Sequence, residues 1–158
     1  MVIIKNINIE EKQLTTRKID VPSLSQKDEI TCINQLYLSN TCDYESILKS
    51  EIKSKINSYK QQDIKKKKYD EENFVTFDYV IEKLLCSKLK CYYCTGRVKI
   101  FYDLCKDENQ WTLDRINNET GHNDGNVLIS CLDCNLKRRK LDKDKFNFTK
   151  KMRIKKLN

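Results

Sequence analysis

Residues 111–135 read WTLDRINNETGHNDGNVLISCLDCN, and this stretch decides the fold. Residues 111–116 and 126–130 have the apolar and β-branched content of two short strands, and a turn rich in Gly and Asn at 121–125 separates them. The basic segment 135–141 suits a helix. We therefore expect the order strand, loop, strand, helix.

Two cysteine pairs flank these strands, and each pair has two residues between its members. Cys91 and Cys94 precede the first strand, whereas Cys131 and Cys134 follow the second. Zinc prefers four thiolate or imidazole ligands in a tetrahedron, and such a pair can bring both sulfurs to one ion. We predict a closed, structural Cys₄ zinc site. The alternative is two pairs of buried free cysteines.

The composition excludes a membrane-spanning chain and favours an anionic partner. The 158 residues include 31 Lys and Arg against 23 Asp and Glu, a net charge of +8. No stretch approaches the roughly 18 apolar residues that a membrane helix needs. The start lacks the apolar core of a secretory signal, so we expect an intracellular protein with reduced thiols, cytoplasmic or nuclear, or in a virion or virus factory if the source is viral.

The first half of the chain is predicted to be mainly helical. Residues 28–39 suit a short helix, and residues 43–68 suit a long one that Asp43 can cap. Thr76 can start a further helix. The apolar positions of the long helix are Ile47, Leu48, Ile52, Ile56, Tyr59 and Ile64.

These patterns predict an α+β protein with three parts. Residues 1–89 form a mainly helical N-terminal region, residues 90–141 a zinc domain, and residues 142–158 a basic C-terminal extension. Three Gly and one Pro make a loop-rich all-β fold an unsuitable alternative.

Residues 90–141 resemble the HNH, or ββα-metal, endonucleases, and within them the zinc-stapled endonuclease VII-like group and the HNH proteins of phages and large DNA viruses. The match covers about a third of the chain. It consists of the two cysteine pairs, Leu113-Asp114-Arg115-Ile116, Gly121-His122, Asn126-Val127, and Asn135 directly after Cys134.

The resemblance implies hydrolysis of a DNA phosphodiester with a catalytic Mg²⁺ or Mn²⁺ ion. It implies that Asp114 and Asn135 bind this ion and that Asn126 supports the loop between the strands. Asp and Asn supply the oxygen donors that such ions prefer. The alternatives are a capping or bridging role for Asp114 and helix N-capping by Asn135.

Arg115 stands where the family typically has the histidine that acts as general base. A guanidinium stays protonated, so Arg115 can hold a phosphate but cannot readily take a proton. His122 is the only histidine and is a second candidate for the base. The alternative for His122 is an exposed turn residue without a chemical role.

Two basic runs are candidates for phosphate contacts. Lys137, Arg138, Arg139 and Lys140 are expected to lie near the scissile strand, whereas Lys65–Lys68 are equally well explained as a solvated helix face. Three hypotheses stay open: a DNA endonuclease, a zinc-containing nucleic-acid-binding protein that does not cut, and an accessory protein that uses the cysteine motif as an interface. Whether the chain forms a homodimer is also open.

Overall fold

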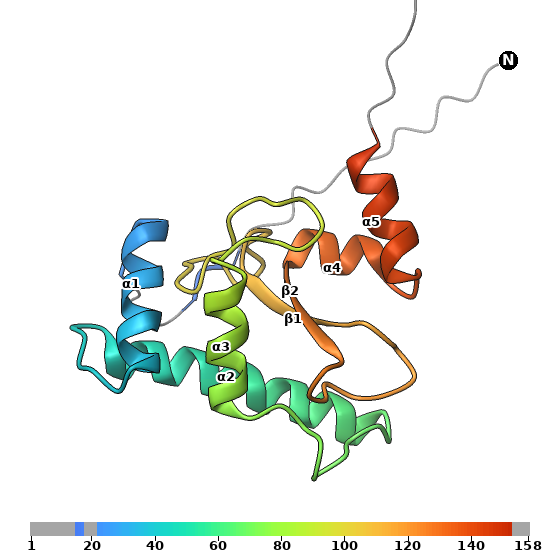
Figure 1. Cartoon of the computed structure of the whole chain (residues 1–158), viewed down its shortest axis with the longest axis horizontal. Coiled ribbons are helices and arrows are strands. Elements are labelled where there is room, and N and C mark those ends of the chain that lie inside the picture. Colours follow the sequence, from blue (N-terminus) through green and yellow to red (C-terminus); the bar gives the residue numbers. More distant parts are fainter. Residues whose placement is uncertain (1–14, 18–21, 153–158) are drawn as a thin grey trace, which may run out of the picture.

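The computed structural model describes residues 15–17 and 22–152, and this part of the chain is α+β, as predicted. Figure 1 shows the long helix α2 across the bottom of the view, with α1, α3 and a two-stranded hairpin above it. The elements are α1 (Gln26–Tyr37), α2 (Glu45–Lys65), α3 (Phe77–Cys86), β1 (Trp111–Arg115), β2 (Val127–Cys131), α4 (Leu132–Arg138) and α5 (Lys143–Lys151).

The helices of the first half begin and end within a few residues of the predicted bounds. Thr76 caps α3 as predicted, because its hydroxyl accepts a hydrogen bond from the Tyr79 amide at 3.2 Å. The predicted cap at Asp43 is wrong: Tyr44 precedes α2, and no side chain caps that helix.

One face of α2 is buried and includes two acidic residues, Glu51 and Asp63. The buried positions include Leu48, Ile52, Tyr59 and Asp63, which are spaced by four, seven and four residues along the helix. Ile64, predicted to continue the apolar stripe, is 46% exposed, and Asp63 takes the buried place instead. A buried carboxylate at the end of an apolar stripe requires a partner from another element.

The hairpin pairs β1 with β2 in antiparallel register, with Trp111 opposite Cys131 and Arg115 opposite Val127. Both strands are almost wholly buried, which two strands alone cannot achieve. The Tyr59 hydroxyl of α2 accepts a hydrogen bond from the Leu113 amide at 3.0 Å, α4 contacts both strands, and α3 contacts β2. The hydrophobic core is therefore continuous across residue 90, from the helical region into the hairpin.

The helix after the hairpin begins earlier than predicted. α4 starts at Leu132, and Cys131 is its N-cap, with Sγ accepting from the Cys134 amide at 3.4 Å. Cys134 thus lies in the first turn and Asn135 in the next. Asn135 does not cap the helix, so the capping alternative for this residue is wrong.

The basic C-terminal segment packs on the body through one aromatic residue. Phe146 of α5 is buried, and its ring centroid lies 4.9 Å from that of Tyr93. Phe148 and Met152 are exposed; residues 153–158 lie outside the described part. Within that described part, no helix has both the length and the apolarity needed to cross a bilayer.

Candidate functional site

The two cysteine pairs come together in space as predicted. One sulfur atom from each of Cys91, Cys94, Cys131 and Cys134 lies within 4.8 Å of the other three. The Sγ atoms of Cys94 and Cys131 are 3.9 Å apart. Four sulfurs about 2.3 Å from a central zinc ion lie about 3.8 Å from one another in a tetrahedron. The four cysteines therefore fit a metal ion such as zinc.

The local backbone explains how the first pair reaches the second. The chain reverses between Cys91 and Gly96, with the Cys91 amide donating to the Gly96 carbonyl at 2.9 Å and the Thr95 amide donating to the Cys91 carbonyl at 2.9 Å. Gly96 lies close under Cys94, where a Cβ atom would be 3.4 Å from Sγ. A hydrogen bond from Cys131 lowers the pKa of Cys91 to about 4, so one thiol of the cluster already favours the thiolate that a metal binds.

A pocket of about 240 Å³ collects four of the five residues predicted to be catalytic. It lies between the C-terminal half of α2, the end of β1 and α4. Asp114, Arg115, His122 and Asn135 line it, and sequence positions up to 21 residues apart thus meet at one place. Its other lining residues are Tyr59, Gln62, Lys66, Leu113, Asn118, Leu136 and Arg139.

His122 is buried in the wall of this pocket and is held by Asp63 of α2. The His122 Nδ1 atom lies 3.0 and 2.9 Å from the two carboxylate oxygens, and the His122 amide donates to Asp63 at 2.6 Å. The imidazole also lies against the Tyr59 ring, with centroids 4.4 Å apart. The alternative of an exposed turn residue is therefore wrong.

With Nδ1 bound to Asp63, Nε2 is the ring nitrogen left for a ligand; no hydrogen bond to Nε2 occurs within the described residues. Burial lowers the pKa of His122, the hydrogen bond to Asp63 raises it, and the charges of Arg115 and Lys66 lower it further. The net direction is downward, so the imidazole is neutral at physiological pH. A neutral imidazole with one nitrogen fixed by a carboxylate can accept a proton on the other.

The loop that carries His122 can approach α2 because residue 121 is glycine. A Cβ atom at Gly121 would lie 2.4 Å from the Lys68 carbonyl oxygen and 2.7 Å from an Asp63 carboxylate oxygen. Asn126 holds the same loop, since its amide group donates to the Asn117 carbonyl (3.0 Å), the Thr120 hydroxyl (2.8 Å) and the Gly121 carbonyl (2.8 Å). Asn126 thus positions the loop and does not line the pocket.

Asp114 is buried and bound by two side chains. Its Oδ1 atom accepts from Arg138 Nη1 at 2.7 Å, and Oδ2 accepts from the Tyr93 hydroxyl at 2.6 Å. Arg138 is itself 1% exposed and also donates to the backbone carbonyls of Arg115 (2.5 Å) and Ile116 (3.0 Å). The bridging alternative for Asp114 therefore describes its place in this structure, where it joins α4 to the end of β1.

The pocket as arranged does not fit a divalent cation. Magnesium takes oxygen ligands in octahedral geometry, usually one or two carboxylates together with waters and substrate phosphates, and manganese favours the same donors. Asp114 has a guanidinium on one oxygen and a phenol on the other. Asn135 donates its amide to Thr112 at 3.1 Å, which leaves its carbonyl oxygen as a single further donor. Arg115, Arg139 and Lys66 add positive charge to the same pocket.

The buried pair predicts that Asp114→Ala destabilises the protein. The substitution leaves the Arg138 guanidinium buried without its carboxylate, which typically costs about 3–5 kcal/mol of folding free energy. Asp133→Ala is the matched control, because Asp133 pairs with Lys137 on the exposed side of the same helix, where an ion pair contributes about 0–1 kcal/mol. Urea unfolding of both variants measures the difference. Equal destabilisation of the two variants would show that the buried Asp114–Arg138 pair contributes no more to folding stability than the exposed Asp133–Lys137 pair.

The basic residues divide into a buried one and an exposed set. The predicted phosphate contact at Arg138 is wrong for this structure, because the Arg138 side chain is buried and donates hydrogen bonds to Asp114 and to backbone carbonyls. Lys137, Arg139 and Lys140 are exposed, although Lys137 is paired with Asp133. Arg139 lines the pocket, and so does Lys66 from the other basic run. One residue from each basic run therefore lines the same pocket.

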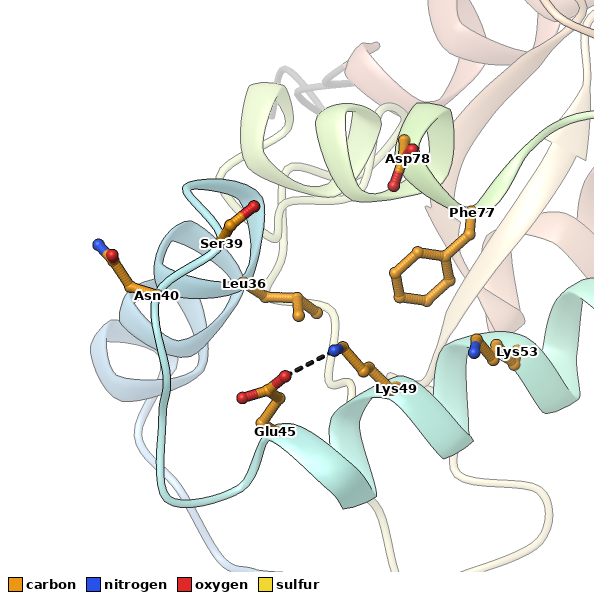
Figure 2. Close-up of a pocket in the computed structure, with 8 residues that line it drawn as sticks. All are labelled: Leu36, Ser39, Asn40, Glu45, Lys49, Lys53, Phe77 and Asp78. Atoms are coloured by element: carbon orange, nitrogen blue, oxygen red, sulfur yellow. Dashed lines mark hydrogen bonds and ion pairs between the residues drawn. The ribbon is translucent and has the colours of Figure 1, made fainter.

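A larger pocket, about 500 Å³, lies away from these residues, among α1, α2 and α3 (Figure 2). Its two lysines are already engaged: Lys49 pairs with Glu45 at 2.5 Å, and Lys53 lies over the Phe77 ring. None of the predicted site residues lines it. We therefore place the candidate site at the smaller pocket beside the hairpin.

Sequence reasoning did not predict the contacts of Asp63 with His122, or of Tyr93 and Arg138 with Asp114. Asp63 had a readable signal, because it stands at a position of the buried stripe of α2 where the pattern expects an apolar residue. The partners of Tyr93 and Arg138 lie 21 and 24 residues away, and no local pattern indicates such contacts.

No protein-family model, no curated protein and no solved structure matches this chain. Its function is therefore inferred from the site itself.

Proposed function

We propose that this chain is a DNA endonuclease built on an HNH-type ββα unit, and that it hydrolyses phosphodiester bonds in the pocket beside the hairpin. The observation that carries the proposal is His122, a neutral imidazole fixed by Asp63 in a pocket that also presents Arg115 and Arg139. A base can activate the attacking water, and two cations can stabilise the charge that develops on the phosphate during phosphodiester hydrolysis.

The proposed reaction gives each group one task. His122 Nε2 takes a proton from a water molecule, whose oxygen attacks the phosphorus. The bond from phosphorus to the leaving sugar oxygen breaks, and that oxygen receives a proton from solvent. Arg115 and Arg139 stabilise the charge that develops on the phosphate oxygens.

We assign zinc to the cysteine cluster as the structural ion of this unit. Four protein ligands leave no open coordination position, so the ion takes no part in hydrolysis. It would fix the Cys91–Gly96 reversal to the start of α4, which carries Asn135 to the pocket and is followed directly by Arg139.

A requirement for Mg²⁺ or Mn²⁺, which the family resemblance implies, would demand that Asp114 exchange Arg138 for the ion. The same pairing favours a second candidate function, a nucleic-acid-binding protein that does not cut. The test is nicking of supercoiled plasmid by the purified, zinc-loaded chain without added metal and with either Mg²⁺ or Mn²⁺. Nicking in any of the three that His122→Ala abolishes supports the nuclease; no nicking by a DNA-binding wild type supports the second candidate.

Binding to DNA is expected to weaken steeply with salt. Each phosphate that the protein neutralises adds about 0.9 to the slope of log affinity against log salt concentration. Replacing Lys66, Arg115 and Arg139 by Ala should weaken binding to every duplex sequence and reduce the slope by about 0.9 for each phosphate that is no longer neutralised. Fluorescence anisotropy over a salt series measures both quantities.

Lys137→Ala is the matched control for this experiment, because Lys137 is exposed on α4 but paired with Asp133 and does not line the pocket. An unchanged slope in the triple variant would remove the phosphate-binding role of the pocket.

A further inference from the structure

Lys55 of α2 carries an amine that the fold partly removes from water. Its Nζ atom donates to the Trp111 carbonyl and lies 4.9 and 5.0 Å from the ring centroids of Trp111 and Tyr102. An ammonium has three N–H donors, and the Trp111 oxygen is the single hydrogen-bond acceptor for this amine in the described part of the chain. A neutral amine has two N–H donors and a free lone pair, so with this single acceptor it leaves one donor unpaired where an ammonium would leave two.

The charges around Lys55 only partly oppose this desolvation. Burial lowers the pKa of Lys55 to about 7, Glu51 and Asp107 raise it, and Arg17 lowers it. The attraction of Glu51 is weakened because Arg17 pairs with it at 2.8 Å. A much larger share of the Lys55 amine is therefore unprotonated at neutral pH than of an ordinary lysine, whose pKa is about 10.4.

Lys55 borders a second pocket that adjoins the candidate site. This pocket, about 350 Å³, is lined by Lys55 together with Gln110, Thr112 and other residues. Tyr59, Gln62, Asn135 and Leu136 line both pockets. Lys55 thus lines one pocket, the cations Arg115 and Arg139 line the other, and the shared residues connect the two.

We propose that Lys55 forms an imine with the aldehyde of an abasic site in DNA. The inference rests on the proposed DNA binding and adds a second activity to it. An amine reacts with a carbonyl carbon, and the adjoining cations bind phosphate. An abasic nucleotide carries both groups, because its ring-opened sugar is an aldehyde flanked by two phosphates. It also lacks the base that would crowd the pocket.

The chemistry balances without any oxidant or reductant. The Lys55 nitrogen attacks the C1′ carbonyl carbon, and the carbonyl oxygen leaves as water after taking one proton from the amine and one from solvent. The iminium ion that results makes the C2′ proton acidic. That proton passes to water, and the C3′–O bond breaks with its electron pair leaving on the phosphate, which cuts the strand without hydrolysis.

The test is trapping of the imine on a duplex that contains one abasic site. The full, zinc-loaded chain is incubated with this duplex and cyanoborohydride, without added divalent metal, at several pH values. We expect one covalent adduct per chain, located at Lys55 by peptide mass spectrometry, with a rate that is half-maximal near pH 7. Lys55→Arg should reduce trapping at least tenfold. Lys53→Arg, an exposed lysine of the same helix, should trap as the wild type does.

Lys55→Met is the second variant, because it keeps an apolar stem in case the larger guanidinium of Lys55→Arg does not fit the site. Circular dichroism and zinc content show whether each variant is folded. An adduct that survives both variants or maps to another lysine would overturn the inference, as would binding of the abasic duplex without any adduct. In those cases plasmid nicking by the wild type would leave the nuclease proposal intact. Trapping at Lys55 without cleavage of intact DNA would overturn the nuclease proposal alone, and a chain that binds no DNA would overturn both.

Discussion

Cys94→Ser should release the metal and unfold the hairpin with α4. Cys94 is the one exposed member of the cluster, so its substitution tests metal binding with little change to packing. Binding of a structural zinc ion supplies about 10–16 kcal/mol of apparent free energy, which is comparable with the whole free energy of unfolding of a typical domain, about 5–15 kcal/mol. We expect about one zinc ion per wild-type chain, almost none in the variant, and loss of the cooperative thermal transition.

Cys86→Ser is the matched control for this substitution. Cys86 is exposed at the end of α3 and lies outside the cluster, so the variant should keep both its zinc and its melting temperature. Elemental analysis and circular dichroism measure the two quantities. A folded Cys94→Ser protein with the wild-type melting temperature would show that the four cysteines do not staple the fold.

The hairpin and the cysteine cluster could be predicted from the sequence because both depend on local spacing. Two strands separated by a turn, with a Cys-x₂-Cys pair on each side, leave few arrangements that satisfy four thiols. The exact bounds of the elements do not follow from spacing alone. The predicted helix at 135–141 is observed as α4, which begins at Leu132, because Cys131 caps it with the same sulfur atom that faces the cluster.

The side-chain pairings of the candidate site could not be predicted in this way. Asp114 and Arg138 each have a clear local explanation, as a metal ligand and as a phosphate contact, and the structure instead pairs them with each other. Burial decides between these outcomes, since an isolated charge inside a protein must find the opposite charge. The sequence pattern shows the charges but not which of them the fold buries.

The same pairing affects how mutants of the site are to be interpreted. Loss of cleavage in Asp114→Ala would be expected from either a lost metal ligand or a destabilised end of β1. Variants of His122 and Asp63 test the chemistry more directly, because His122 makes no hydrogen bond to the cysteine cluster or to Arg138 in the described residues.

His122→Ala should reduce nicking by about 10²–10⁴-fold, the usual contribution of a general base, while zinc content and DNA affinity stay unchanged. The wild-type rate should fall as the pH drops through the pKa of His122, because only the neutral imidazole accepts a proton. Burial lowers this pKa, so the fall should be centred below the ordinary histidine value of about 6.5. Initial rates between pH 4.5 and 8 give the profile.

Asp63→Asn distinguishes a positioning role from a purely structural one. The amide can keep a hydrogen bond to His122 but lacks the negative charge that raises the pKa of the imidazole. We expect a lower maximum rate and a fall in rate centred at still lower pH than in the wild type. Asp124→Asn is the control, because Asp124 is an exposed acid of the same loop, and it should leave the profile unchanged.

If His122→Ala nicks plasmid as fast as the wild type, or if Asp63→Asn lowers the rate without moving the pH profile, then the His122–Asp63 pair does not supply the base. In that case the proton must pass to another group in the pocket.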